Sequence, residues 1–206
     1  RGSPPPDFRP LVVHRSRPLA DLVERTNKES QNLYAECLFK RLGYEFGRRL
    51  AGNPIGSWAT GKLAIEEFLQ TDLKLAKPNC AIDDGSGLSE LNRVTPDVLV
   101  RVLTSALNQP WSYRFVESLA VAGTDGTLRR RMRGTAAASQ IRAKTGYIAS
   151  VSALSGYVTD PGGKPRLVFA ILVNDFDRGD LWAARQLQDR ICLALVEYLE
   201  SRATSN

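Results

Sequence analysis

The sequence predicts an α+β protein in which an antiparallel sheet is flanked by helices. Three observations predict this fold class. Apolar residues recur at helical spacing through most of the first 120 residues. Three runs rich in β-branched and aromatic residues then follow one another between residues 141 and 173. Helical spacing returns in the last long segment, so helices, a meander and a closing helix should form layers around one sheet.

The N-terminal third is expected to contain one strand and three helices. Residues 1–9 are rich in proline and are interpreted as a tag or linker remnant. Leu11–His14 is apolar enough for a short strand, and Pro18 suits the first turn of a helix. The second helix should end near Gly43. The residues expected on the buried faces are Leu19, Leu22 and Val23 in the first helix, Leu33, Cys37, Leu38 and Leu42 in the second, and Leu63, Ile65, Phe68 and Leu69 in the third.

In the middle of the chain, we expect a brief strand, a tight segment and two further helices. The strand is Cys80–Ile82, and it leads into the tight segment Asp83–Gly87. Thr95-Pro96-Asp97 predicts a helix start, because Thr can cap, Pro suits the first turn and Asp favours the positive helix end. That helix should bury Val98, Leu99, Val102 and Leu103, and a short helix should begin near Pro110.

The last third is predicted to form a consecutive antiparallel meander that a helix covers. Its strands are Ile141–Ala149, Val151–Thr159 and Leu167–Val173. A turn over Asp160–Lys164, with proline and two glycines, joins the second strand to the third. The closing helix, from Leu181 to Leu199, is expected to bury Leu187, Ile191, Leu195 and Leu199.

Composition narrows the class of protein. The 206 residues are 43% hydrophobic, which is enough for one substantial core, and we assign this domain to residues 10–200 with a tail at 201–206. No stretch approaches the roughly 20 apolar residues of a transmembrane helix. Three distant cysteines match no zinc spacing, so at least one should be a free and buried thiol, and the lone His14 suggests no metal site.

Two further patterns suggest functions that we weigh and set aside. The net charge of +6 is spread out except for a cluster at Arg129, Arg130, Arg131 and Arg133. This cluster is interpreted as a solvated surface, and it lacks the interleaved aromatic residues of a nucleic-acid site. Gly56–Lys62 has the spacing of a phosphate-binding loop, but Leu63 occupies the position of the metal-binding Ser or Thr, so nucleotide binding is not expected.

Lys144-Thr145-Gly146 is the first of two motifs that carry chemistry. It lies on the first strand of the meander, where a sheet edge can accept an extended peptide. Lys144 would be a fixed cation for a substrate carboxylate, and Thr145 would donate a hydroxyl to the same group. Gly146 leaves room for the substrate backbone. The N–H of Tyr147 would then be one donor of an oxyanion hole.

The second motif is Ser30-Gln31-Asn32, which lies where the first predicted helix gives way to the second. A hydroxyl at Ser30 could pass a proton to a leaving amine, while Asn32 could hydrogen-bond a substrate amide. The alternative interpretation is structural, because a serine is also a common N-cap and could simply begin the second helix.

Several segments around these motifs, in the same order, resemble a known family. They are Leu19–Val23 with Lys28–Glu36, Asp84–Ser89 with Asn92, and Ala122–Leu128 running on to Arg142–Gly146. Across residues 10 to 200 the chain is similar to the class C low-molecular-mass penicillin-binding proteins, which are D-alanyl-D-alanine carboxypeptidase/endopeptidases. The resemblance implies part of a penicillin-binding/β-lactamase-like three-layer domain.

The resemblance also implies a function. Ser30, Asn32 and Lys144 would be catalytic, and Thr145, Gly146 and Tyr147 would bind substrate. The substrate would be a peptidoglycan stem peptide, cleaved through an acyl-enzyme that β-lactams also form. No metal or organic cofactor is implied, and the substrate places the protein in the periplasm or cell envelope.

One expected motif of this family, a nucleophilic Ser followed three residues later by Lys, is absent, and Ser139-Gln140-Ile141-Arg142 is the nearest approach to it. Three explanations remain open. The chain can be a C-terminal fragment, a cleavage product that stays bound to the missing N-terminal segment, or a pseudoenzyme. The rival to an enzyme is therefore a non-catalytic module that binds cell-wall peptides.

Overall fold

The computed structural model describes residues 9, 11–50, 55–75 and 80–203. Its central feature is a four-stranded antiparallel sheet in the order β3-β4-β5-β6. The strands are β3 (Ala120–Val121), β4 (Ile141–Ile148), β5 (Val151–Thr159) and β6 (Pro165–Val173). The three predicted runs thus form the predicted meander. Of the proposed linker, residues 1–9, only residue 9 is described, and residues 201–203 of the proposed tail belong to the last helix.

The two-residue strand β3 was not predicted, because its sequence signal is too short. It pairs with the start of β4, where Ala120 is opposite Ala143 and Val121 is opposite Arg142. Both β3 residues are buried, so β3 belongs to the core rather than to a loop. Because β3 ends at this register, only the first part of β4 has a strand partner on that side.

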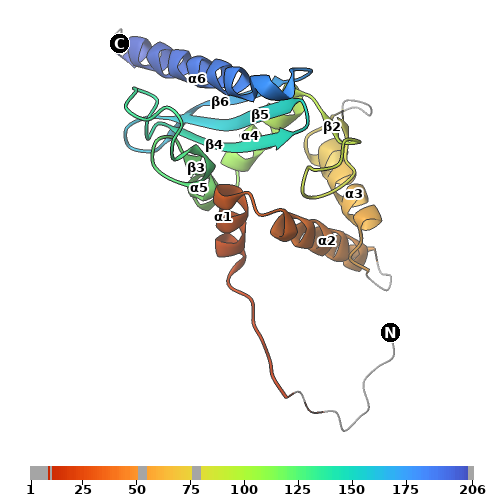
Figure 1. Cartoon of the computed structure of the whole chain (residues 1–206). Coiled ribbons are helices and arrows are strands. Elements are labelled where there is room, and N and C mark those ends of the chain that lie inside the picture. The colour runs from red at the N-terminus through yellow and green to blue at the C-terminus, as the bar shows by residue number, and fades with distance from the viewer. Residues whose placement is uncertain (1–8, 10, 51–54, 76–79, 204–206) are drawn as a thin grey trace.

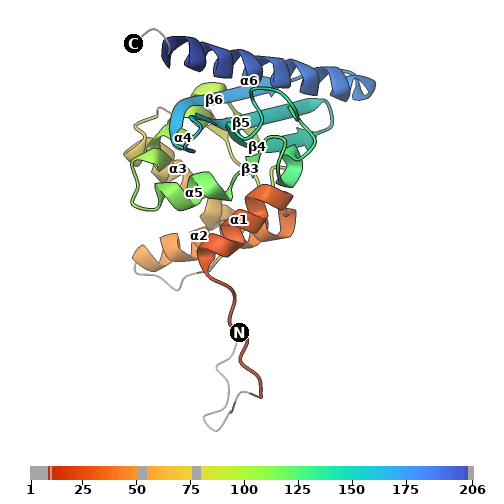
Figure 2. The same cartoon turned by 90° about the vertical axis from the view of Figure 1, so that its left-hand side faces the viewer.

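Helices cover both faces of the sheet, as predicted for the three-layer fold. On one face lies α6 (Leu181–Ala203), and on the other lie α4 (Pro96–Leu107) and α5 (Ser112–Ser118) (Figures 1 and 2). Alternation along β5 separates two cores. Leu154 and Val158 join Cys192 and Val196 of α6, whereas Tyr157 packs among Leu103, Val116 and Leu119.

The predicted buried face of α6 was partly wrong. Leu187 is 48% exposed, whereas Ala184, Gln188, Cys192 and Val196 form the buried stripe. These four residues recur every fourth position, which places them on one helix face. The prediction failed because it weighted large apolar residues. The face that contacts the sheet instead uses small residues and one glutamine whose amide donates to Ser152 Oγ at 3.1 Å.

The remaining helices are α1 (Leu19–Glu29), α2 (Asn32–Arg49) and α3 (Trp58–Glu67), which continues into a π-helical turn, η1 (Phe68–Asp72). Helix α2 does not end near Gly43 as predicted, because Gly43 faces α3. A Cβ there would lie 2.6 Å from the backbone nitrogen of Gly61. The helix therefore runs through Gly43, where two backbones approach closely.

The predicted apolar face of α2 was also partly wrong, although Leu38 is half-buried. Leu33 is 70% exposed and Leu42 is 44% exposed, and Cys37 is exposed as well. The buried residues of α2 are Phe39, Gly43 and Phe46. Helical spacing fits either set, and only the packing of α3 against α2 selects the face with the two phenylalanines.

The segment Leu11–His14 is not a strand, contrary to the prediction. Its residues are exposed and form no regular secondary structure, and no described strand pairs with them. Strand β1 (Cys80–Ala81) does form, and it pairs with β2 (Arg93–Val94). Apolar character alone was insufficient, because a strand also needs a partner for its backbone groups.

The loop between β1 and β2 is organised by Asp84. Its carboxylate accepts hydrogen bonds from the backbone N–H groups of Gly87 and Ser89 at 2.8 and 3.0 Å, and from Asn92 Nδ2 at 2.8 Å. Burial raises the pKa of Asp84, but these hydrogen bonds and one from Ser86 outweigh it, so the pKa is lowered overall.

The segment Gly56–Lys62 serves a structural purpose. Ser57 caps α3 through a capping box with Thr60, and Lys62 Nζ pairs with Asp83 Oδ1 at 2.6 Å. Lys62 therefore holds the loop between β1 and β2 against α3.

Candidate active site

Ser30 lies at the junction of α1 and α2 in an unusual backbone conformation. Its φ and ψ are 54° and 51°, in the left-handed region that serine rarely adopts. The N-cap of α2 is Gln31, not Ser30, so the structural interpretation of Ser30 as an N-cap is wrong. Strain of this kind persists where surrounding contacts hold it, and it points to a positional requirement at Ser30.

The hydroxyl of Ser30 accepts a hydrogen bond from Lys144. The two atoms, Ser30 Oγ and Lys144 Nζ, are 2.8 Å apart although the residues are 114 positions apart in the chain. Lys144 Nζ also donates to the carbonyl oxygen of Thr145 at 2.5 Å. Folding therefore brings the two sequence motifs together at one point.

The ammonium of Lys144 is poorly hydrated and has no carboxylate partner in the described part of the chain. Burial lowers its pKa from 10.5 to about 8, since a low-dielectric environment disfavours the charged form. Its two hydrogen-bond acceptors are neutral oxygens. Lys144 is thus a cation that an incoming carboxylate could neutralise, or a proton donor near neutral pH.

Two polar contacts fix α1, and with it Ser30, against the sheet. Lys28 Nζ forms an ion pair with Asp125 Oδ2 at 2.7 Å, and Asp125 Oδ1 accepts from the N–H of Val121 at 2.7 Å. Asn27 Nδ2 donates to Ser118 Oγ at 2.8 Å. The C-terminal turn of α1 is therefore tied to β3 and α5, which limits movement of Ser30 relative to β4.

Gly126 permits the closest approach to α1. It has a φ of +52°, and a Cβ there would lie 2.7 Å from the carbonyl oxygen of Lys28 and 2.9 Å from Ala120 Cβ. No larger residue fits without displacing the helix. Sequence reasoning assigned no role to Asp125 and Gly126. Their only signal was that they lie in Ala122–Leu128, one of the segments that resemble the family.

The second half of β4 has an open edge. Its register pairs residues 141–148 with β5, but β3 covers only residues 142 and 143. From Lys144 onward, no described strand pairs with the other side. Gly146 and Tyr147 are exposed there, so an extended peptide could add to this edge.

Alternation along β4 sends neighbouring side chains to opposite faces. Lys144 points toward α1, while Thr145 and Tyr147 lie on the face covered by α6. Thr145 Oγ1 donates to Thr127 Oγ1 at 2.9 Å, and the Tyr147 ring centroid is 6.0 Å from Arg185 Cζ of α6. Thr145 therefore contacts a different set of residues from Lys144.

Asn32 is the first residue of α2 and is exposed. Within the described ranges, its side chain has no hydrogen-bond partner, so its amide is accessible to a ligand. The structure thus brings the side chains of Ser30 and Lys144 into direct contact, places the Thr145 hydroxyl on the opposite face of β4, and leaves Asn32 two residues after Ser30 in sequence. The chemical roles of these residues, and of Gly146 and Tyr147, stay predictions.

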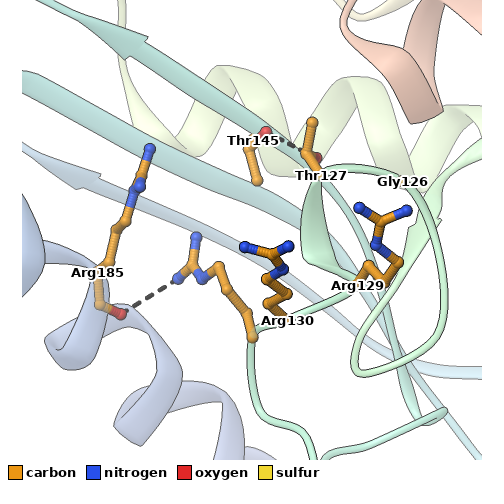
Figure 3. Close-up of a pocket in the computed structure, with 7 residues that line it drawn as sticks. Gly126, Thr127, Arg129, Arg130, Thr145 and Arg185 are labelled. Carbon is orange, nitrogen blue, oxygen red and sulfur yellow. Dashed lines mark hydrogen bonds between the residues drawn. The ribbon is translucent and has the colours of Figure 1, made fainter.

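A cavity adjoins Thr145 on the face toward α6 (Figure 3). Its volume is about 510 Å³, and it is lined by Gly126, Thr127, Arg129, Arg130, Arg131, Thr145 and Arg185. The cluster interpreted from the sequence as a solvated surface therefore contributes three residues to a concave site.

The described residues contain no group of three His, Cys, Asp or Glu side chains that could hold a metal, and none of the described helices is long and apolar enough to cross a membrane.

Comparison with known proteins places these features in a family. Residues 1–194 match the model of the D-Ala-D-Ala carboxypeptidase 3 (S13) family. The chain is 40% identical over 202 residues to a D-alanyl-D-alanine carboxypeptidase of Actinomadura sp. (strain R39), an alignment that covers 96% of this chain and 35% of that protein. It is 31% identical over 173 residues to the D-alanyl-D-alanine carboxypeptidase DacB of Haemophilus influenzae, covering 83% and 35%.

A solved structure has the same fold. Penicillin-binding protein 4 (dacB) from Haemophilus influenzae, in complex with a β-lactam, superposes with a TM-score of 0.74 at 29% identity, over 90% of this chain and 42% of that one. The chain spans about a third of the length of the curated relatives described above. It belongs to the D-Ala-D-Ala carboxypeptidase 3 (S13) family.

Proposed function

From this family membership and the contact between Ser30 and Lys144, we propose that the complete protein is a serine-type D-Ala-D-Ala carboxypeptidase or endopeptidase. Its substrates would be peptidoglycan stem peptides, and β-lactams would inhibit it by acylating the nucleophilic serine, which is a different residue from Ser30. Because those substrates lie in the cell wall, the protein would act in the periplasm or cell envelope.

The observation that carries the proposal is the 2.8 Å hydrogen bond between Lys144 Nζ and Ser30 Oγ beside the open edge of β4. A half-buried lysine that has no carboxylate partner among the described residues attracts the carboxylate of a ligand. A hydroxyl that contacts this lysine can exchange a proton with it. The open edge can hold the peptide next to both groups.

In the proposed mechanism, a substrate peptide lies along β4 beyond Ala143. Lys144 and Thr145 bind the carboxylate of the terminal D-residue, Gly146 allows the close approach of the backbone, and Asn32 holds a substrate amide. The N–H of Tyr147 donates to the carbonyl oxygen of the scissile bond, whose negative charge grows as the tetrahedral intermediate forms.

The nucleophile would come from a part of the complete protein outside these 206 residues. Its hydroxyl oxygen loses its proton as it bonds to the scissile carbonyl carbon. The C–N bond then breaks, and the leaving amine receives a proton through Ser30, which balances the one that the hydroxyl gave up. Water then attacks the resulting ester, which releases the shortened peptide and regenerates the serine. On this account, the 206-residue chain alone supplies half of the site and should be inactive.

Covalent labelling of the complete protein with a fluorescent penicillin tests the proposal. Ser30→Ala and Lys144→Ala should each slow labelling by about 100-fold or more, the order expected when a group that transfers protons or stabilises charge is removed. Lys164→Ala removes an exposed lysine from the turn between β5 and β6 and serves as the matched control. Unchanged labelling in both site variants would remove the two residues from the site.

The alternative, a binding module that never turns over, makes a different prediction. The complete protein would then bind a D-Ala-D-Ala peptide at equilibrium but release no D-Ala and form no covalent penicillin adduct. A Ser-x-x-Lys motif in the rest of the complete protein would favour the enzyme, and its absence there would favour this alternative. Mass spectrometry of the complete protein after incubation with penicillin separates the two.

A further inference from the structure

The cavity beside Thr145 has an unusual electrostatic character. Four of its seven lining residues are arginines, and none is acidic. The arginines come from two places that are distant in sequence. Arg129, Arg130 and Arg131 follow β3, whereas Arg185 lies on α6. A run of basic residues in the sequence therefore supplies three of the arginines, and tertiary folding adds the fourth from α6.

One of the four arginines is already neutralised. Arg131 Nη2 is 2.6 Å from Asp189 Oδ1 and 3.0 Å from Gln188 Oε1, so Arg131 anchors the loop to α6. Arg129 and Arg130 are exposed and have no hydrogen-bond or ion-pair partner among the described residues. Arg185 lies against the ring of Tyr147 and has no carboxylate partner there. The cavity thus carries about three uncompensated positive charges.

The cavity is continuous with the candidate active site. Thr145 lines it, and its hydroxyl is hydrogen-bonded to Thr127, which also lines it. In the view of Figure 3, Arg130 lies between Arg185 and Arg129, and Thr145 lies above it. Under the proposed function, Thr145 binds the carboxylate of the residue that leaves. A group attached to that residue is therefore the part of the substrate nearest the arginines.

We propose that this arginine cavity binds a second anionic group carried by the leaving residue, so that leaving groups with two carboxylates are cleaved in preference to D-Ala alone. This inference rests on the proposed function. Arginine forms bidentate hydrogen bonds with carboxylates, and a partly enclosed site strengthens them. A volume of about 510 Å³ suits a small ligand group rather than a polymer.

The chain offers a matched control for charge. Arg133 belongs to the same cluster in sequence and is exposed, but it does not line the cavity. An anionic polymer that binds the outer surface would contact Arg133 as well as its neighbours. A carboxylate held inside the cavity would not. Comparing R129Q/R130Q with R133Q therefore separates the cavity from a general basic surface.

The experiment uses the complete protein and pairs of substrates that differ only in charge. N-acetyl-D-Ala-D-Glu and N-acetyl-D-Ala-D-Gln form one pair. The homologous pair has one more methylene in the side chain of the leaving residue, in case the shorter side chain does not reach the arginines. We expect the diacid to have the higher kcat/KM in the wild type. R129Q/R130Q should lower the diacid-to-amide ratio about ten-fold, since each charged hydrogen bond of this kind contributes a factor of that order. R133Q should leave the ratio unchanged.

Three results would overturn the proposal. The first is a wild-type ratio near one for both pairs. The second is an R129Q/R130Q variant whose ratio equals that of the wild type. The third is an equal loss of preference in R133Q, which would indicate a general surface effect. The rate of penicillin labelling should be the same in R129Q/R130Q as in the wild type, because penicillin does not need the second carboxylate.

Equilibrium binding distinguishes this proposal from the proposed function. If the complete protein neither cleaves peptides nor reacts with penicillin, but binds the diacid more tightly than the amide and loses that preference in R129Q/R130Q, the catalytic proposal fails and the cavity assignment holds. If the protein reacts with penicillin but shows no preference in binding or cleavage, the cavity assignment fails alone.

Discussion

Replacing Lys144 with methionine should make the protein more stable while it abolishes reaction with penicillin. Methionine has a similar length and shape but no charge to desolvate. Burial lowers the pKa of Lys144 from 10.5 to about 8, which corresponds to about 3 kcal/mol between the charged and neutral forms. Loss of the hydrogen bond to Ser30 removes about 1 kcal/mol. A net gain of about 2 kcal/mol in the free energy of unfolding is expected at pH 7.

The pH dependence gives the same reasoning a second test. Between pH 8 and pH 10.5, Lys144 is neutral in the folded protein and charged in the unfolded chain. The unfolded state then binds more protons, so the wild type gains stability as the pH rises through this window. The Lys144→Met variant has no such group, so its advantage should be largest below pH 8 and shrink toward pH 10.5.

Thermal and denaturant unfolding of the complete wild type and variant at pH 7, 8.5 and 10 would measure this difference. Lys164→Met, which changes an exposed lysine, controls for a general effect of charge and should change stability by less than about 0.5 kcal/mol. A Lys144→Met variant that is less stable than the wild type at pH 7, or whose advantage is independent of pH, would refute the burial of a charged lysine.

Three further predictions concern the framework. Gly126→Ala should destabilise the protein by about 2–3 kcal/mol and slow penicillin labelling, because it adds steric overlap to positive-φ strain. Gly134→Ala, at a residue with φ +74° where a Cβ would meet nothing within 4 Å, should destabilise the protein less. Equal losses of stability in the two variants would contradict the close contact of Gly126. Asp84→Ala should lower the free energy of unfolding by about 2–4 kcal/mol at pH 7. Because the pKa of Asp84 is lowered, this difference should shrink as the pH falls below about 3.8, as acid unfolding curves would show. Cys37 is exposed and should react rapidly with a thiol reagent. Burial raises the pKa of Cys192 to about 12, so Cys192 should react only after unfolding. Equal reaction rates of the two thiols in the folded protein would contradict the burial of Cys192.

The meander and the capped helix α4 could be predicted from the sequence because their signals are local. Thr95 accepts a hydrogen bond from the N–H of Val98, as its position before Pro96 indicated. The turn over residues 160–164 joins β5 to β6. Alternating and capping patterns specify these elements without reference to the rest of the chain.

Buried faces and strand pairing depended on the partner elements. Leu33 and Leu187 are large and apolar, yet both are exposed, because Gly43 and Ala184 let neighbouring elements approach more closely elsewhere on each helix. Helical periodicity leaves two or more faces possible. Only the packing of α3 against α2, and of α6 against the sheet, selects one of them.

The sequence by itself determined the fold class and the meander, and it singled out the two motifs that are predicted to carry chemistry. The tertiary structure decided that Ser30 contacts Lys144, that Thr145 faces away toward α6, and that Arg129 and Arg130 line a cavity with Arg185. The physical reason is the distance along the chain over which each kind of interaction acts. Backbone propensities and caps act over a few residues, whereas a site is built from side chains more than 100 positions apart, whose distances only the complete packing of the chain can set.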